Sequence, residues 1–318
     1  MNAGERGAIT TVTLNAAIDR RLEVSVLTPR TVMRARRAES TAGGKGLNVA
    51  RVARRLGCDV IATGFIAGHA GSFIAENVEQ EGIAPAFVRI SGESRSCINI
   101  IDASGHSTEI LEPGPTVDSG DLETLLAVVR DQASRSSIVA MSGSPPRGCP
   151  EGFYADLIRE IHAAGALAFL DSSSACLSHG LQARPDFVKP NTDEIRDLVG
   201  EEVSCPSSAA RAAIEVAKKH QVRMVVVSLG PQGAVGAFGG RAWWVEAPDV
   251  PVANTVGCGD AFVGAFAVEH QSSGDPVAAL VAGVRVSSAV AMSDTTGSFR
   301  QEDLDLIRQA SPAIHEVG

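Results

Sequence analysis

The fold is decided by short apolar runs that each end in a polar loop: IVAMSGSPP (138–146), ALAFLDSSS (166–174), DFVKPN (186–191) and RMVVVSLGPQG (223–233). Segments with a helical pattern alternate with these runs, at about 120–134, 151–164 and 207–220. Strands that alternate with helices predict an α/β fold, a doubly wound, mostly parallel sheet with helices on both faces. Ligands of such sheets bind beyond the carboxyl ends of the strands, where Asp171, Lys189, Asn191 and Ser228 fall.

Two stretches break this rhythm, because residues of about 20–40 and about 95–112 read as extended. The second contains CINIID and HSTEILEP, alternating runs that are separated by a turn with Gly105. We expect both stretches to form a small β-sheet lid over the carboxyl edge of the main sheet. Such a lid would shield a substrate and could also mediate a homodimer.

Composition narrows the class of protein. A chain of 318 residues with 44% hydrophobic residues can bury a sizeable core, and we expect one domain over residues 1–318. A net charge of -9 argues against nucleic acid or an anionic membrane as the main partner. The start, MNAGERGAITTVTLN, has no signal-peptide pattern, and no apolar stretch approaches the roughly 20 residues that span a bilayer, so we expect a cytoplasmic protein. The six cysteines form no Cys-x-x-Cys pair, which gives no zinc or redox motif.

A glycine loop precedes an apolar helical pattern in NTVGCGDAFVGAFAVEH (254–270), with Asp260 in the expected first turn. Glycines and a helix N-terminus direct N–H groups at one point and hold an anion there. A carboxylate beside that cradle can take the proton of an attacking hydroxyl. The pattern therefore indicates a phosphoryl-transfer site, although Asp260 would also suit an ordinary helix start, where a negative charge is favourable.

A second glycine loop enters a helix in TAGGKGLNVARVARRLG (41–57), and Lys45 and Asn48 can project from it toward a ligand. It is not a P-loop, because Gly46 follows the lysine where Ser or Thr is required. GCGDAFVG does not fit Gly-x-Gly-x-x-Gly either, since Phe262 takes the last position. Of the 28 basic residues only four are lysine, and Lys45 and Lys189 are the two that stand inside motifs.

Together, GGKGLN, MSGSPPRG, LDSSS, VKPNTDE, VVVSLGPQG and TVGCGDAF resemble the PfkB branch of the ribokinase-like sugar kinases, over about residues 8–300. TLNAAID, AGGKGLNVAR, SRSCIN and TEILEPGP are most similar to the tagatose-6-phosphate kinase and 1-phosphofructokinase group. The resemblance implies a ribokinase-like fold and an ATP-dependent kinase that uses Mg²⁺.

The resemblance also implies roles for individual residues. Asp260 would be the catalytic base, and the backbone of Gly257, Cys258 and Gly259 would form the anion hole, with Cys258 where alanine is usual. The residues expected to bind the sugar and its phosphate are Asp19, Gly43, Gly44, Lys45, Asn48, Arg95 and Asn99. The residues expected to bind ATP are Lys189, Asn191, Glu194, Ser228, Gly230, Gly233 and Thr255. Glu194 would hold magnesium through water, with Asp171 a weaker candidate there, or would serve only as a helix-start acid.

The substrate that these motifs favour is a phosphorylated ketohexose, tagatose 6-phosphate or fructose 1-phosphate, converted to the 1,6-bisphosphate. Some relatives carry a basic residue near Glu109, so 6-phosphofructokinase fits less well. A kinase of an unphosphorylated sugar or nucleoside remains an alternative, and so does an inactive sugar-phosphate sensor. The seven histidines show no ligand spacing, and Trp243 and Trp244 are expected only to pack a strand.

Overall fold

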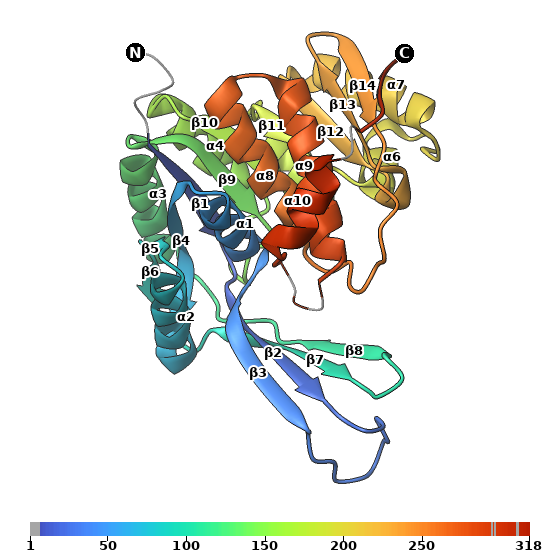
Figure 1. Cartoon of the computed structure of the whole chain (residues 1–318). Coiled ribbons are helices and arrows are strands. Elements are labelled where there is room, and N and C mark those ends of the chain that lie inside the picture. The colour runs from blue at the N-terminus through green and yellow to red at the C-terminus, as the bar shows by residue number, and fades with distance from the viewer. Residues whose placement is uncertain (1–6, 294, 296, 310–311) are drawn as a thin grey trace.

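The computed structural model describes residues 7–293, 295, 297–309 and 312–318. Within them an eleven-stranded sheet crosses the body of the molecule (Figure 1). Its parallel part comprises β1 (Ala8–Thr13), β4 (Asp59–Ala67), β5 (Ala84–Pro85), β6 (Val88–Ile90), β9 (Ser136–Ser142), β10 (Leu167–Asp171), β11 (Phe187–Val188) and β12 (Met224–Ser228). One edge continues antiparallel through β13 (Ala234–Phe238), β14 (Arg241–Val245) and β15 (Ile314–Val317). The predicted doubly wound, mostly parallel sheet is confirmed.

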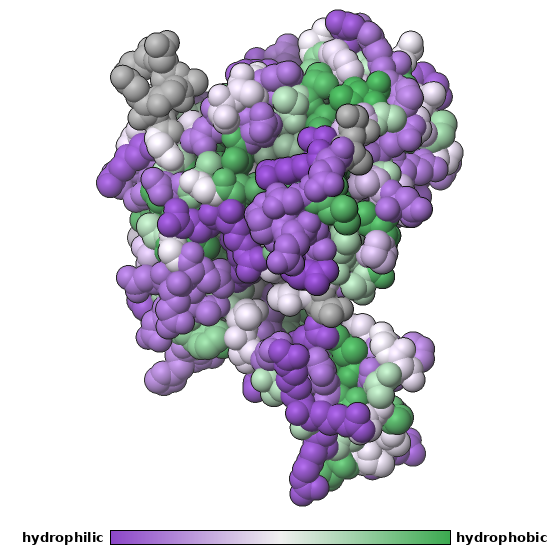
Figure 2. Space-filling view, viewed as in Figure 1, coloured by the Kyte–Doolittle hydropathy of each residue, from purple (hydrophilic) through white to green (hydrophobic). Residues whose placement is uncertain are grey.

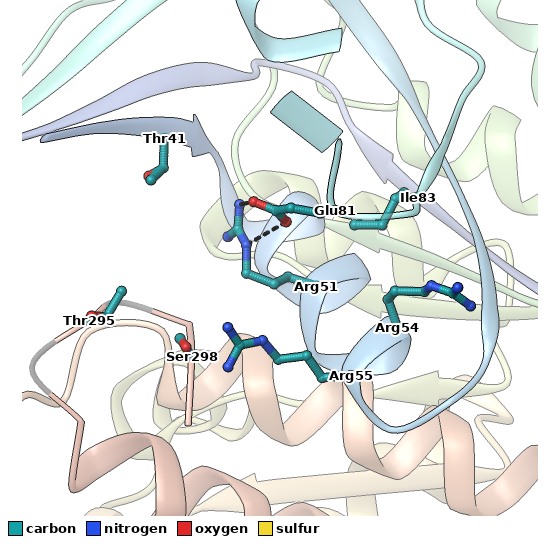
Figure 3. A pocket seen from close by; sticks show the side chains of 8 residues that line it. All are labelled: Thr41, Arg51, Arg54, Arg55, Glu81, Ile83, Thr295 and Ser298. Atoms are coloured by element: carbon teal, nitrogen blue, oxygen red, sulfur yellow. Dashed lines mark hydrogen bonds and ion pairs between the residues drawn. The ribbon is translucent and has the colours of Figure 1, made fainter. Parts of the chain in front are cut away.

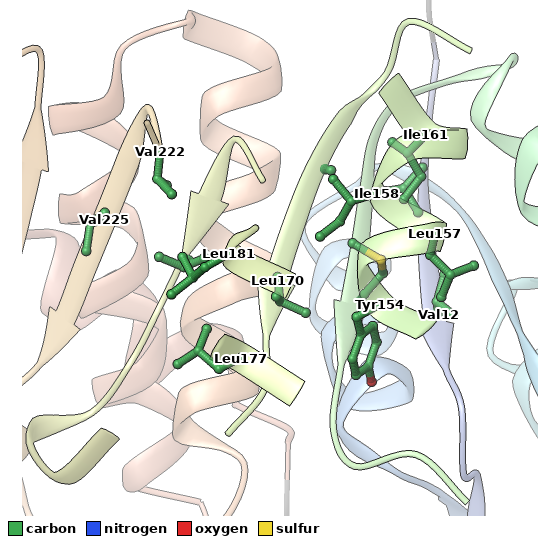
Figure 4. Close-up of a cluster of buried hydrophobic side chains, with 14 of the residues drawn as sticks. Val12, Tyr154, Leu157, Ile158, Ile161, Leu170, Leu177, Leu181, Val222 and Val225 are labelled. Atoms are coloured by element: carbon green, nitrogen blue, oxygen red, sulfur yellow. The ribbon is translucent and has the colours of Figure 1, made fainter. Parts of the chain in front are cut away.

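Helices cover both faces of this sheet because successive strand residues point to opposite sides. Ile138 and Ala140 of β9 pack with α1 (Lys45–Arg55), α2 (Gly68–Gln80), α8 (Cys258–Ser273) and α9 (Pro276–Ala291). Val139 and Met141 belong to the opposite cluster, part of which Figure 4 shows. Its helices are α3 (Ser119–Ala133), α4 (Phe153–Ala163), α5 (Ser174–Leu181), α6 (Thr192–Val199) and α7 (Pro206–His220). The last helix, α10 (Gln301–Gln309), packs on α9.

The lid projects from the body as a separate sheet (Figure 1). In the described chain it has four strands, in the order β3 (Arg37–Gly43), β2 (Ala17–Glu23), β7 (Arg95–Ile101) and β8 (Ser107–Leu111). Gly105 has a φ of 83° in the turn between β7 and β8, as its place between alternating runs predicted. Both predicted segments therefore join one small sheet, which meets the body where β3 ends at Gly43.

The two faces of the lid differ in polarity. Asp19, Cys97 and Asn99 share one face, because Cys97 pairs with Asp19 and Asn99 lies two residues further along the strand. Leu22 and Ile100, which also pair with each other, lie on the opposite face. Figure 2 shows apolar side chains among the polar ones on the lid. In the described part of the chain, no helix has the length and apolarity to cross a membrane.

Candidate active site

Helix α8 begins with the glycine loop that the sequence singled out. Gly257 has a φ of 85°, a left-handed conformation that favours glycine, and it caps the helix, which starts at Cys258. Asp260 therefore lies in the first turn, where the backbone N–H groups have no carbonyl partner within the helix. Asp260 is only 6% exposed, so this helix start holds a buried carboxylate rather than a solvated one.

The surroundings of Asp260 bring the pKa of its carboxyl group close to neutral pH. Burial, and next the negative charge of Asp171, raise the pKa of Asp260 to about 7. A hydrogen bond of 2.8 Å from Nδ2 of Asn48 to Oδ2 of Asp260 acts against this rise, as do the charges of Lys45 and Lys189. A carboxylate with this pKa can both accept and release a proton near pH 7.

Lys189 and Asp171 meet at the carboxyl ends of neighbouring strands. Asp171 is the last residue of β10 and Lys189 directly follows β11, and Nζ of Lys189 lies 3.2 Å from Oδ1 of Asp171. The same Nζ lies 3.4 Å from the point where a side chain on Gly259 would begin. The lysine is thus adjacent to the start of α8, although about 70 residues of sequence separate Lys189 from Gly259.

Lys45 is the first residue of α1, and the residue is exposed as a whole, while its ammonium group lies among other protein atoms. Burial acts to lower its pKa, but the carboxylates of Asp171, Asp260 and Glu194 raise the pKa of Lys45 overall. Cβ of Lys45 lies 3.6 Å from the point where a side chain on Gly143, directly after β9, would begin, so the lysine leaves α1 beside the strand ends. The structure therefore gathers both motif lysines around Asp260.

Asp19 lies directly over Gly43 at the root of the lid. A Cβ atom on Gly43 would stand 2.1 Å from Cγ of Asp19, so the two residues fit only because position 43 has no side chain. Burial raises the pKa of Asp19 to about 6, while Arg51 and Arg95 act to lower it. Gly44, with a φ of 116°, then caps α1.

Arg95 and Asn99 lie on the same lid strand but have different neighbours. Nε of Arg95 donates to the carbonyl of Asn15 at 3.1 Å, and its charge acts on Asp19. Asn99 is further out along β7, where its Oδ1 accepts a hydrogen bond of 2.7 Å from Oγ of Ser107. The structure therefore places Arg95 beside the expected sugar site and leaves Asn99 within the lid.

Asn191 and Glu194 form a capping box at the start of α6. Oδ1 of Asn191 accepts from the backbone N–H of Glu194 at 2.8 Å, and Oε2 of Glu194 accepts from the N–H of Asn191 at 2.9 Å. This geometry is the helix-start role, which is one of the two roles that the sequence allowed for Glu194. Its charge nevertheless reaches Lys45, so the carboxylate faces the same region.

The remaining nucleotide-side candidates occupy the adjacent loops. Asn191 pairs with Ser228 in an isolated bridge, and Gly230 begins a short 3-10 turn after β12. Thr255 is exposed, and its carbonyl accepts from the N–H of Cys258 at 3.3 Å. Gly233 instead packs against the body, since a Cβ atom there would stand 2.0 Å from the carbonyl oxygen of Val245.

The described residues contain no group of three or more His, Cys, Asp or Glu side chains that could hold a metal ion. Magnesium does not require such a group, because it keeps several water ligands and takes the rest from one or two carboxylates and substrate phosphates. The carboxylates that would hold the ion are Glu194, through water as expected from the resemblance, and Asp171, which is paired with Lys189.

Arg51 is a site residue that the sequence motifs did not indicate: it is buried, and its Nη1 donates to Oδ1 of Asn48 at 3.1 Å. The signal was its position one helical turn after Asn48. A hollow of about 350 Å³ adjoins it, lined by Thr41, Arg51, Arg54, Arg55, Glu81, Ile83, Thr295 and Ser298 (Figure 3). A second hollow, of about 580 Å³, is lined by Lys218, Phe238 and His270, among others, and neither of the two hollows is lined by a predicted site residue.

The fold and these motifs define a sugar kinase, a phosphotransferase with an alcohol group as acceptor. The model of the pfkB family carbohydrate kinases matches residues 11–302, and the chain belongs to that family.

Several known proteins are similar to the chain over most of its length. A tagatose-6-phosphate kinase of Staphylococcus epidermidis is 37% identical over 261 residues, which are 81% of this chain and 84% of the relative. Phosphofructokinase-2 from Escherichia coli, solved in complex with potassium, superimposes with a TM-score of 0.89 at 28% identity, covering 95% of this chain and 98% of that one. A putative phosphofructokinase from Staphylococcus aureus gives a TM-score of 0.85 at 27% identity, covering 98% and 100%. The chain is thus similar to phosphosugar kinases.

Proposed function

We propose that the enzyme transfers the γ-phosphoryl group of ATP to a ketohexose that already carries one phosphate. Tagatose 6-phosphate and fructose 1-phosphate are the favoured substrates, and each would yield a 1,6-bisphosphate. The observation that carries the proposal is the buried Asp260 at the glycine-capped start of α8, with Lys45 and Lys189 beside it. The relative named tagatose-6-phosphate kinase supports this choice of substrate.

In the proposed reaction, Asp260 accepts the proton of the free primary hydroxyl. The sugar oxygen then attacks the γ-phosphorus in line, a new P–O bond forms, and the bond to the β-phosphate oxygen breaks to release ADP. The N–H groups of Gly257, Cys258 and Gly259 and the ammonium of Lys189 stabilise the charge on the moving group. When bound, Mg²⁺ would neutralise charge on the ATP phosphates.

The sugar would lie between Asp260 and the lid. Asp19 accepts hydrogen bonds from sugar hydroxyls, while Lys45 and Arg95 bind the phosphate that the sugar already carries. Glu109 lies on β8, opposite Asn99 of β7 and two strands from Asp19, and its charge acts on Asp19 from that side of the lid. Tagatose 6-phosphate and fructose 6-phosphate carry the phosphate at the same position and differ only in the configuration at C4, so this charge does not separate those two substrates, and the kinetic comparison below does.

ATP would bind along the loops after β11 and β12, where Asn191, Ser228 and Gly230 lie. We also propose that the chain is a single kinase domain that works in the cytoplasm as a homodimer. Val32 and Ile110 of the lid are 94% and 53% exposed, and a second copy of the lid would cover them.

The test is a comparison of kcat/KM for tagatose 6-phosphate, fructose 1-phosphate, fructose 6-phosphate and the corresponding free sugars. We expect one of the first two to exceed every free sugar by at least about a hundredfold, since a lost charge-assisted phosphate contact is costly. Arg95→Ala should raise KM for the phosphosugar far more than KM for ATP. Equal turnover of free and phosphorylated sugars would overturn the proposal.

A further inference from the structure

Arg51 is a buried arginine in the middle of α1, with a side chain that is 10% exposed. Its Nε and Nη2 donate to the carboxylate of Glu81 at 2.8 and 3.1 Å. Figure 3 shows the guanidinium turned toward Glu81, whereas Arg54, one turn further on, points away. Glu81 therefore fixes the orientation of the Arg51 fork, and the remaining donors are aimed by it.

Nη1 of Arg51 determines which way the amide of Asn48 faces. A guanidinium can only donate, so its bond of 3.1 Å selects the amide oxygen, Oδ1, and turns the amide nitrogen the other way. That nitrogen donates to Oδ2 of Asp260 at 2.8 Å. If the amide turned over, its oxygen would face the carboxylate of Asp260, and two acceptors would repel each other.

Arg51 also holds the backbone at the root of the lid. Its Nη2 donates to the carbonyl of Ala42 at 2.9 Å, while the N–H of Ala42 donates to Oδ1 of Asn77 at 2.6 Å. The peptide groups on both sides of Ala42 are thus fixed just before Gly43, over which Asp19 lies. The charge of Arg51 also acts to lower the pKa of Asp19.

We propose that Arg51 is a positioning residue for phosphoryl transfer. Held by Glu81, it orients the Asn48 amide so that Asn48 donates to Asp260, and it fixes the end of β3 that carries the lid. One side chain thereby sets the direction of the base and the place of the sugar-binding strand. This inference rests on the proposed function, in which Asp260 is the base.

A double-mutant cycle on kcat tests the route through Asn48, with both substrates saturating. Arg51→Gln should lower kcat by about ten- to a hundredfold, as expected for the loss of a charge-assisted contact. If Arg51 acts through Asn48, the variant Arg51→Gln/Asn48→Ala should match Asn48→Ala alone within about twofold. Effects that simply multiply would overturn the proposal.

The pH profile of kcat supplies a readout that a merely structural role would not move. The Asn48 donation lowers the pKa of Asp260, so Arg51→Gln should shift the acidic limb of the profile to higher pH. An unchanged limb would contradict the proposal. Arg51→Lys keeps the charge but not the forked guanidinium, and we expect its kcat to remain low. Full activity of Arg51→Lys would show that only the charge matters and would contradict the orienting role.

Arg54→Gln is the matched control, because Arg54 contacts Cys58 and Asp59 and does not touch Asn48. We expect its kinetics to equal those of the parent enzyme. Should Arg51→Gln fail to fold, Glu81→Gln loosens the same guanidinium and should shift the limb in the same direction. Asp260→Asn in the same assay separates this inference from the proposed function. Normal turnover of Asp260→Asn would show that Asp260 is not the base and would overturn the proposed function. Slow turnover of Asp260→Asn together with normal turnover of Arg51→Gln would overturn only the positioning role of Arg51.

Discussion

Lys189 and Asp171 form an ion pair of 3.2 Å at the edge of the sheet, and both side chains are almost fully buried. Removal of one partner from a buried pair leaves an uncompensated charge, which costs more than the pair contributes. Lys189→Met should therefore lower the free energy of unfolding by about 3 kcal/mol, measured by urea denaturation. It should also lower kcat, because the developing charge beside Gly259 loses a cation.

The double variant Lys189→Met/Asp171→Asn separates these effects. Without the unpaired carboxylate, most of the lost stability should return, while kcat should stay low. A double variant as unstable as Lys189→Met would show that the pair does not account for the loss.

The raised pKa of Asp260 predicts a pH-dependent cost to stability. Its folded-state pKa is about 7, against 3.8 for the unperturbed group, so the folded protein binds the proton more tightly between these values. The free energy of unfolding therefore falls as pH rises from about 4 toward 7, because the buried carboxyl group of Asp260 has to ionise, and the whole loss is present above pH 7. Asp260→Asn should raise the free energy of unfolding at pH 8 by on the order of 2 kcal/mol, and by less at pH 5. Urea denaturation at both pH values measures this; an equal gain at both would contradict it.

Gly43→Ala should displace Asp19, because the new Cβ would stand 2.1 Å from its Cγ. We expect KM for the sugar substrate to rise by at least about tenfold, with KM for ATP little changed, since the ordered carboxylate contact is lost. Gly152→Ala is the control: its φ is −80°, and no atom lies within 4 Å of its added Cβ. If KM for the sugar does not change in Gly43→Ala, Asp19 does not bind the sugar.

The layers of the fold could be predicted because they depend on local patterns. Apolar runs with polar ends became β9 to β12, and the alternating runs around Gly105 became the lid hairpin. The antiparallel edge formed by β13 to β15 was not predicted. β15 comes from the end of the chain and pairs with β14 about 70 residues earlier, and a single sequence does not show such pairing.

The candidate site was predictable where a motif fixes its own geometry. Asp260 was expected in the first turn of a helix and lies there, because Gly257 and the apolar pattern after it define that helix. The contact between Asn48 and Asp260 joins residues 212 positions apart, and nothing in either motif indicates it. For Glu194 the sequence motif is compatible with two roles. A capping box at the helix start and a contact to magnesium both require an acidic residue at this position, so the sequence did not choose between them.

The most direct test of the account is the turnover of Asp260→Asn on tagatose 6-phosphate and fructose 1-phosphate, with ATP binding measured by calorimetry. If Asp260 is the base, kcat should fall at least about a hundredfold while the dissociation constant of ATP stays within about threefold of the parent value. Turnover close to that of the parent enzyme, with the substitution verified, would contradict the assignment of the base and the mechanism built on it.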